Sequence, residues 1–252
     1  MSGGNGTTAA FVGATGGAGT TRTVVEVAAL YAAEGRDVAV LDAAFATQGL
    51  ASYLGGSLAP DVTALVTDAA ERPLSAGLVD LDAGTPGRVA CCPAYAAFER
   101  LARAKAPAAA ERFEARIAEA AERFDAVLVD VSPVAANQAV GAVVACDRVV
   151  LVAPASSRGA DALGRVDARL ADLGVPVDAA VSTFGGLPDA DAAVPESATR
   201  DVAGAPTAVD GEEGFAPAVA AVAAVALDRT LPTESDEGGV LDGVRRYVGG
   251  RG

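Results

Sequence analysis

The chain has 252 residues, of which 51% are hydrophobic, and this is enough to bury a core in one large domain or two small ones. Its 19 Lys and Arg residues against 33 Asp and Glu residues give a net charge of −14, and histidine is absent. The missing histidine excludes histidine acid–base catalysis, histidine metal ligands and histidine pH sensing. The acidic balance, with no basic stripe, disfavours non-specific nucleic-acid binding, which depends on clustered lysine and arginine.

Short apolar runs alternate with helical patterns along the whole chain. In chain order the pattern predicts a strand at 9–12, a helix at 21–34, a strand at 38–41, helical segments near 50–54 and 62–70, a strand at 89–92, two helical pieces within 94–123, strands at 126–129 and 148–153, a helix at 160–173, a strand at 177–181 and a helix at 216–229. This alternation predicts an α/β fold: a doubly wound, mostly parallel sheet flanked by helices on both faces.

The last twenty residues differ in composition from the rest. We expect residues 1–232 to form one domain, followed over 233–252 by an acidic linker and a short amphipathic helix at 240–248. This helix has apolar residues on one face with Arg245 and Arg246 beside them. Docking on the core is one interpretation and contact with a membrane surface is the other; the short length and low net basicity favour docking.

The remaining composition indicates a cytoplasmic protein. The N-terminus MSGGNGTTAA lacks the charged region of a signal peptide, and the longest apolar run, 216–227, is too short to span a bilayer. The three cysteines form neither a disulfide framework nor a CxxC ligand pair, so we expect Cys91 and Cys92 to be small buried hydrophobic residues. An acidic chain with one lysine is typical of a salt-rich, halophilic cytoplasm, but also of a moderately acidic protein from a GC-rich genome.

A glycine-rich segment, FVGATGGAGTTR over residues 11–22, joins the first predicted strand to the first helix. Glycines allow the backbone to approach a phosphate closely, and a helix N-terminus supplies free amides and the positive end of the helix dipole. A tight strand–helix turn that needs glycine only for packing is the alternative without a ligand. Four glycines within residues 13–19 favour phosphate binding.

Two families share such a loop. The motif GATGGAG at 13–19 resembles the fingerprint of NAD(P) binders of the short-chain dehydrogenase kind, with Asp42 at a suitable distance to contact a ribose. The motif TGGAGTTR at 15–22 resembles the KGGxGK[ST][ST] loop of the ParA/MinD family of deviant Walker-A P-loop ATPases. A dehydrogenase of the first kind needs Tyr-x-x-x-Lys, and none of the four tyrosines has a lysine four residues on.

Later segments favour the ParA/MinD family. The loop, the helix and the aspartate that ends the next strand follow at the family's spacing over 21–42, and LDAAFATQGLASYLGG at 41–56 resembles the next segment. RVACCPA at 88–94, the Walker-B-like FDAVLVDVSP at 124–133, CDRVVLVAPAS at 146–156 and VPVDAAVSTFGG at 175–186 appear in the expected order. The resemblance covers about residues 9–230 and implies a P-loop NTPase fold.

The resemblance also implies which residues would hold ligands. The nucleotide loop would consist of Thr15, Gly16, Gly17, Ala18, Gly19, Thr20, Thr21 and Arg22. Magnesium would be bound near Thr21, Asp42 and Asp130. The implied cofactor is ATP or ADP with magnesium, and the departures from the family pattern imply that its binding is weak or absent.

Four departures affect the chemistry. Thr20 stands where the family has its P-loop lysine, and Thr15 where it has the lysine that reaches a partner's phosphates. Ala44 replaces the aspartate that positions the attacking water, and Ser182-Thr183 replaces the asparagine that recognises adenine. Losing one charge-assisted contact costs about 1.5–3 kcal/mol, or about 10–100-fold in affinity. Losing each transition-state donor costs about 10²–10³ in rate, so we expect no catalytic residue and hydrolysis near background.

The sequence therefore predicts a ParA/MinD-like pseudo-ATPase that acts as a scaffold or positioning partner in cell division or chromosome partitioning. Its expected partner is a protein, either a second copy in a homodimer or an intact paralogue that supplies a lysine. We expect neither Lys105 nor Arg22 to replace the missing lysine. The alternatives are a weakly active Mg-ATPase that uses Arg22 or a partner residue, and a non-catalytic NAD(P)-binding regulator.

Overall fold

The computed structural model describes residues 6–210 and 214–229. Within them, one eight-stranded sheet contains β1 (Thr7–Gly13), β2 (Val38–Asp42), β3 (Val79–Leu81), β4 (Val89–Cys92), β5 (Ala126–Val131), β6 (Arg148–Pro154), β7 (Ala179–Thr183) and β8 (Ala192–Val194). The strand order is β3-β4-β2-β5-β1-β6-β7-β8. Only the pair β3–β4 is antiparallel in this described sheet, so the predicted mostly parallel sheet is confirmed.

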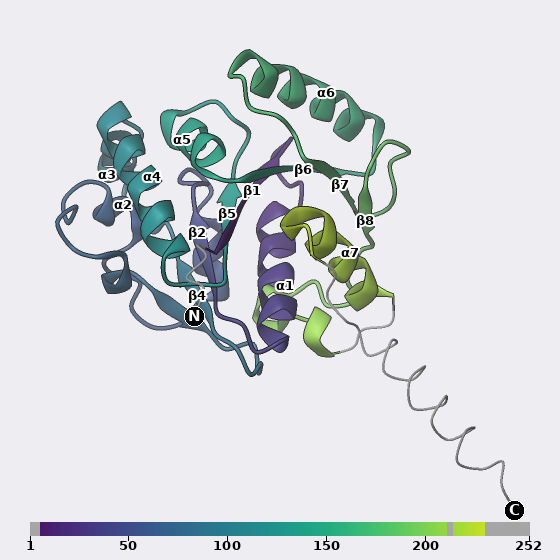
Figure 1. The fold of residues 1–252 in the computed structure, drawn as a ribbon, viewed down its shortest axis with the longest axis horizontal. Helices are drawn as coiled ribbons and strands as arrows, with labels where there is room; N and C mark the ends of the chain where they lie inside the picture. The colour runs from purple at the N-terminus through teal and green to yellow at the C-terminus, as the bar shows by residue number, and fades with distance from the viewer. Residues whose placement is uncertain (1–5, 211–213, 230–252) are drawn as a thin grey trace, which may run out of the picture.

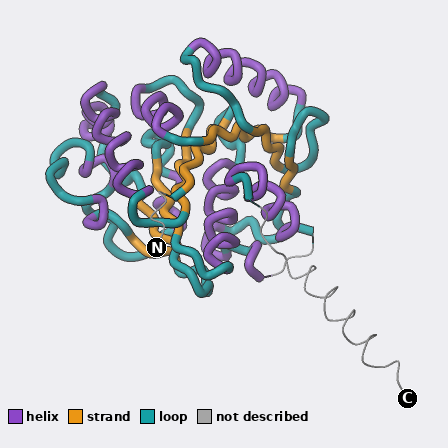
Figure 2. Tube along the Cα trace, viewed as in Figure 1, coloured by secondary structure: helices purple, strands orange, loops and turns teal. Residues whose placement is uncertain are grey.

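Helices cover both faces of this sheet (Figure 1). They are α1 (Thr20–Ala33), α2 (Val62–Leu65), α3 (Phe98–Ala104), α4 (Pro107–Ala121), α5 (Asn137–Ala145), α6 (Ser157–Asp172) and α7 (Phe215–Leu227). One hydrophobic core lies between the sheet and α1 with α7, and the other lies between the sheet and α4, α5 and α6. Figure 2 shows the sheet between these two helical layers. The doubly wound architecture is therefore confirmed.

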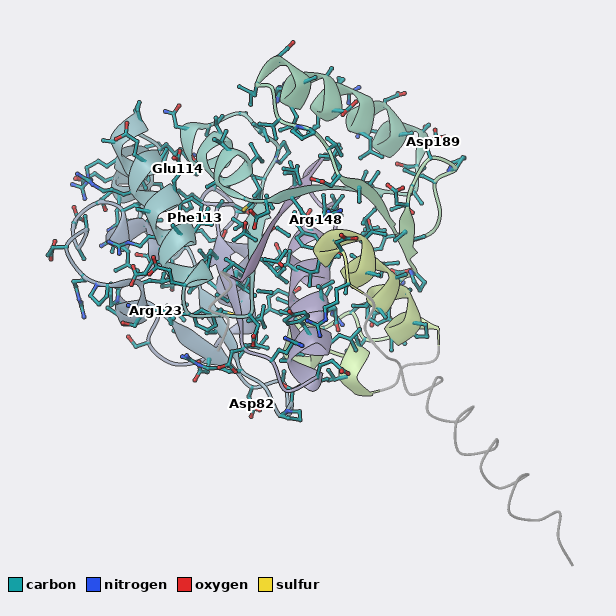
Figure 3. All side chains as sticks on the ribbon, viewed as in Figure 1. Asp82, Phe113, Glu114, Arg123, Arg148 and Asp189 are labelled. Carbon is teal, nitrogen blue, oxygen red and sulfur yellow. The ribbon has the colours of Figure 1, made fainter. Side chains whose placement is uncertain are left out.

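The central strands are buried on both faces, which explains their continuous apolar sequences. In β1, Ala9 and Phe11 belong to the core under α1, whereas Ala10 and Val12 belong to the core under α4. On that second face Phe113 of α4, labelled in Figure 3, meets the ring of Phe45 edge-on at 5.8 Å between centroids. A strand covered on both faces has no polar side to alternate with, so it appears in sequence as an apolar run.

The structure corrects several predicted elements. The edge strands β3 and β8 and the helix α5 were not predicted from the sequence, because three-residue strands are too short to show a period and α5 is apolar on most sides. The helix expected over 62–70 ends at Leu65, and the segment near 50–54 is a 3₁₀ turn, Gly49–Tyr53. The strand expected at 177–181 is displaced to Ala179–Thr183.

Other predictions are confirmed or lie outside the described residues. Gly35 adopts φ +70° directly after α1, as expected of a helix-ending glycine, and Pro107 occupies the first turn of α4. Cys91 and Cys92 are fully buried in β4, where burial raises the pKa of both thiols. The acidic linker and the terminal helix at 240–248 are outside the described part of the chain. In that part no helix is long and apolar enough to cross a membrane.

The strand order brings together the strand ends that carry the predicted site residues. The carboxyl ends of β1, β2 and β5 lie at one edge of the sheet, with Asp42 beside Asp130 and Val12 beside Val131 in register. The chain continues from β1 to one side through β2 and later to the other side through β6. Ligands of open α/β sheets bind in the crevice at such a switch point.

Candidate functional site

The glycine-rich loop between β1 and α1 has a shape that only glycine supports easily. Gly17 and Gly19 adopt φ angles of +74° and +77°. A Cβ on Gly13 would lie 2.7 Å from Oγ1 of Thr20, whose side chain therefore packs against the start of the loop. Gly16 and Gly17 are exposed with open space in front of them. The loop is thus an accessible, backbone-lined turn at the N-terminus of α1.

A hydroxyl–carboxylate pair closes one side of this turn. Oγ1 of Thr21, in the first turn of α1, donates a hydrogen bond of 2.6 Å to Oδ2 of Asp130 in β5. Gly49 permits this approach, because a Cβ there would lie 3.0 Å from Oγ1 of Thr21. Burial raises the pKa of Asp130 to about 6, although the Thr21 hydrogen bond acts in the opposite direction. The pair presents hard oxygen ligands of the kind that Mg²⁺ prefers.

Asp42, the third predicted metal residue, lies behind this pair. It is fully buried, and its two carboxylate oxygens accept hydrogen bonds from the amides of Ala44 at 2.8 Å and Ala94 at 3.2 Å. Burial, and then the nearby Asp130, raise the pKa of Asp42 well above its usual value. Asp42 therefore holds two strand-end loops in place, while Thr21 and Asp130 reach the cavity.

The loop lines a cavity of about 280 Å³, which we call the phosphate cavity. All eight predicted loop residues line it, with Ala44, Thr47, Gly49, Tyr53 and Asp130 among the others. Five hydroxyl-bearing threonine and serine side chains line it, whereas Asp130 and Arg22 are the charged residues among the described lining. Lys105 follows α3 and is not part of this lining, as expected. The described lining of this cavity thus contains the whole predicted glycine loop and no lysine.

Arg22 is engaged elsewhere. Its guanidinium pairs with Glu26 one turn further along α1 and donates to the carbonyl of Thr199 at 3.2 Å and to Oγ1 of Thr207 at 3.1 Å. Glu26 is fully buried and also accepts from the backbone amides of Thr207 and Ala208. Sequence reasoning missed Glu26, although an isolated acidic residue in the apolar run 24–33 was a usable signal.

A second cavity of about 250 Å³ adjoins the first; we call it the apolar cavity. The two share Gly19, Arg22 and Tyr53. The walls of the apolar cavity include Phe184, Val194, Pro195, Phe215 and Val219. Sequence reasoning did not single out Phe184 or Phe215, because Phe184 directly follows β7 and Phe215 begins α7, and no local motif marks either position.

The position expected to recognise adenine carries no free side-chain donor. Oγ of Ser182 donates to the carbonyl of Gly185 at 2.8 Å. Oγ1 of Thr183 donates to the carbonyl of Ala18 in the glycine loop at 2.7 Å. Both residues are buried; Thr183 ties β7 to the glycine loop and Ser182 closes the turn after β7, so neither hydroxyl is left unused.

The side chains at this cavity fit a magnesium ion only when a nucleotide supplies further ligands. No cluster of three or more His, Cys, Asp or Glu side chains suited to a metal occurs among the described residues. Thr21 and Asp130 supply a hydroxyl and a carboxylate at the phosphate cavity. Mg²⁺ is commonly held by one or two carboxylates together with substrate phosphates and water. These two residues therefore fit magnesium that arrives with a nucleotide.

The strand order excludes the dinucleotide-binding alternative as a fold. In that fold the order 3-2-1-4-5-6 places the first and second strands side by side. Here β5 lies between β1 and β2. Asp42, expected to contact a ribose in that alternative, is fully buried and engaged with two amides. The interpretation of the loop as an NAD(P) fingerprint is therefore wrong.

Solved structures of known proteins share the observed architecture. MinD from Pyrococcus horikoshii, complexed with Mg-ADP, matches with a TM-score of 0.73 at 18% identity over 86% of this chain and 94% of its own. A ParA family ATPase from Chlorobium tepidum matches with 0.71 at 17% over 86% and 98%. The MinC:MinD complex of Aquifex aeolicus matches with 0.73 at 16% over 90% and 98%.

Comparison by sequence adds no further assignment. No protein-family model matches the chain, and a search of curated proteins finds no match. The structural matches span nearly the full length of those proteins. This chain has the fold of the ParA/MinD P-loop ATPases, as the sequence resemblance predicted.

Proposed function

We propose that this chain is a ParA/MinD-like pseudo-ATPase that binds Mg-ADP or Mg-ATP weakly and acts through a protein partner. One observation carries the proposal. The phosphate cavity keeps the glycine loop and the Thr21–Asp130 pair, but its described lining contains no lysine, and its arginine is held by Glu26. Shape and metal ligands for a nucleotide are thus retained, whereas the cationic groups that promote hydrolysis are missing.

The retained groups support binding. The amides at the N-terminus of α1 and the positive end of its dipole favour an anion at the loop. Thr21 and Asp130 would hold the magnesium, which when bound neutralises phosphate charge. The apolar cavity, which shares Gly19 and Tyr53 with the lining of the phosphate cavity, offers a place for the base. MinD of Pyrococcus horikoshii, which has this fold, was solved with Mg-ADP.

The missing groups argue against hydrolysis. Thr20 packs its hydroxyl against Gly13 and has no charge to place on a phosphate. Ala44 has no polar side chain that could orient a water, and its amide already donates to Oδ1 of Asp42. Each lost transition-state donor lowers the rate of hydrolysis by about 10²–10³-fold, and two or three such losses remove most of an enzyme's rate enhancement.

The contacts of Arg22 argue against the alternative of an active Mg-ATPase. Its guanidinium is held by a carboxylate, a carbonyl and a hydroxyl on the side of the apolar cavity. Moving it to the phosphates would leave the fully buried Glu26 without its charge partner, and breaking a buried pair in this way costs about 3–5 kcal/mol. Rescue of hydrolysis by Arg22 is therefore disfavoured.

We further propose that the partner is a protein, either a second copy of this chain or an intact paralogue that supplies a lysine. Thr15 lines the phosphate cavity beside exposed Gly16 and Gly17, so a side chain from outside has access to this rim. MinD of Aquifex aeolicus, which shares the fold, was solved in complex with MinC. We propose a scaffold or positioning role in the cytoplasm, without nucleic-acid binding.

The proposal is tested by restoring the missing charge. Calorimetric titration of Mg-ADP into Thr20→Lys should give an affinity about 10–100-fold higher than that of the unmodified chain, because one charge-assisted contact is regained. Thr67→Lys is the matched control, because it adds the same charge at a residue that lines neither cavity, and it should leave the affinity unchanged. Phosphate release from Mg-ATP by the unmodified chain should not exceed that of Thr21→Ala.

Two results would overturn the proposal. If Thr20→Lys binds no nucleotide at millimolar concentration, the loop no longer forms a phosphate site. If the unmodified chain releases phosphate faster than Thr21→Ala, it is an ATPase.

A further inference from the structure

Phe184, directly after β7, has an unusual conformation and exposure. Its φ is +61°, a left-handed backbone conformation that a bulky side chain rarely adopts, and the next residue, Gly185, has φ +136°. Phe184 is 52% exposed, although it belongs to the wall of the apolar cavity. Outliers of this kind persist where the surrounding structure enforces them and occur preferentially at binding sites. Phe184 is therefore a candidate for direct contact with a ligand.

The surrounding contacts fix the place of this ring. Thr183, one residue earlier, is hydrogen-bonded to the glycine loop through Ala18 and accepts from the amide of Ala155 at 2.8 Å. Atom Cζ of Phe184 would lie 3.3 Å from a Cβ on Gly19. The ring thus packs over the loop residue that both cavities share. If the phosphates of a nucleotide bound the glycine loop, the rest of the nucleotide would extend towards the ring of Phe184.

We propose that the base of the bound nucleotide stacks on Phe184, and that this chain accepts adenine and guanine nucleotides without distinguishing them. The inference rests on the proposed nucleotide binding and specifies which nucleotides are bound. Stacking on an aromatic side chain tolerates any base because every base has a π face. A cavity walled by Phe184, Phe215, Val194 and Pro195 suits a planar ring system.

The charged side chains that line the apolar cavity are paired with one another. Arg22 and Glu26 pair with each other and with the segment around Thr207. Glu196 and Arg200 form an ion pair of 2.9 Å at the rim. A site rejects a wrong ligand strongly when buried polar groups would be left unpaired by it. Because these groups have partners without a base, we expect little discrimination between adenine and guanine.

The first test compares leucine substitutions at two exposed phenylalanines. Phe184→Leu keeps apolar bulk but removes the π face, and the dissociation constants of ADP and GDP should both rise about 5- to 100-fold by calorimetry. Phe98→Leu is the matched control, because Phe98 in α3 is 85% exposed and lines neither cavity. Phe184→Tyr should retain the affinity. Pyrophosphate, which has no base, should bind Phe184→Leu and the unmodified chain equally.

A spectroscopic test uses the absence of tryptophan from the sequence. Phe184→Trp introduces a single indole at the proposed stacking position, and ADP and GDP should both quench its fluorescence while pyrophosphate does not. Phe98→Trp should not respond to any of the three.

The outcomes separate this inference from the proposed function. If ADP and GDP bind but Phe184→Leu leaves both affinities unchanged, or if the two affinities differ by more than about 10-fold, the inference is wrong while nucleotide binding stands. If pyrophosphate, ADP and GDP all fail to bind the unmodified chain, both are wrong.

Discussion

At the scale of single residues, the neighbouring carboxyl groups of Asp42 and Asp130 dominate the electrostatics of the site. They occupy paired positions on β2 and β5 and are almost completely buried. Burial raises the pKa of both groups, and their proximity raises that of Asp42 further. Without a bound cation, ionising these groups therefore costs free energy of folding. A divalent cation at Asp130 would offset this cost, which agrees with a site for a magnesium–nucleotide complex.

This cost predicts a pH dependence. The pKa of Asp130 rises from 3.8 to about 6 on folding. Between these values the folded state binds more protons, so the free energy of unfolding falls as pH rises and then levels off. In metal-free buffer at pH 8, Asp130→Asn should therefore be more stable than the unmodified chain, by up to about 3 kcal/mol for a shift of two pKa units. Asparagine keeps an oxygen for Thr21.

Chemical denaturation between pH 4 and pH 8 measures this effect. The advantage of Asp130→Asn should shrink as pH falls towards 4, where the carboxyl of the unmodified chain is protonated in the folded state. Asp189→Asn, at the exposed position labelled in Figure 3, is the control for removing one negative charge. An equal gain from both variants, or no pH dependence of the difference, would contradict the account.

Sequence reasoning located some site residues and missed others for a physical reason. Thr21 and Asp130 were found because a glycine loop and a strand-end aspartate each carry a local pattern. Glu26 and Phe184 were missed because their roles depend on distant segments. Glu26 binds the amide of Thr207, 181 residues away, and Phe184 packs on Gly19 across the fold. The apolar run around Glu26 marks that residue as unusual, but nothing local to either residue identifies its distant partner.

At the scale of elements, helix α6 contains two glycines in opposite environments. A Cβ on Gly159 would lie 2.0 Å from the carbonyl oxygen of Pro154, so a side chain there forces the backbone to move. Gly159 also lies in the first turn, where its amide donates to Oγ of Ser156. A Cβ on Gly164 would meet nothing within 4 Å. The junction between β6 and α6 therefore requires glycine at 159 only.

Alanine substitutions at the two glycines of α6 should change the stability of the chain in opposite directions. Gly164→Ala should stabilise the chain by about 0.5–1 kcal/mol, because alanine loses less backbone entropy than glycine in a helix. Gly159→Ala should destabilise it by more than that gain, because the junction must distort. Urea denaturation of the two variants checks the prediction. Equal effects of the same sign would show that Gly159 does not maintain the close approach of α6 to β6.

Elements were predictable where burial or capping left a clear sequence pattern. The central strands β1, β2 and β5 have continuous apolar runs because helices cover both of their faces. The edge strands β3 and β8 have three residues each, and their pairing with β4 and β7 determines them more than their own composition. Helix α5 was missed because its apolar residues show little helical periodicity.

At the scale of the whole molecule, the alternation of strands and helices was enough to predict a doubly wound sheet. The strand order was not predictable from alternation, and it is the order that distinguishes a P-loop sheet from a dinucleotide-binding one. The resemblance of ordered segments supplied that choice, and the structural matches agree with it. The chain therefore combines the fold of the ParA/MinD proteins with a phosphate cavity whose described lining lacks lysine.

The most direct measurement is a titration of the unmodified chain with ADP in the presence and absence of magnesium, followed by calorimetry and thermal unfolding. Binding only to the native state stabilises it by RT ln(1 + [L]/Kd), so weak affinity is detectable at high ligand concentration. The account predicts one saturable site per chain, strengthened by magnesium, and no phosphate release when ATP replaces ADP. Absence of heat and of a thermal shift at millimolar Mg-ADP would contradict it.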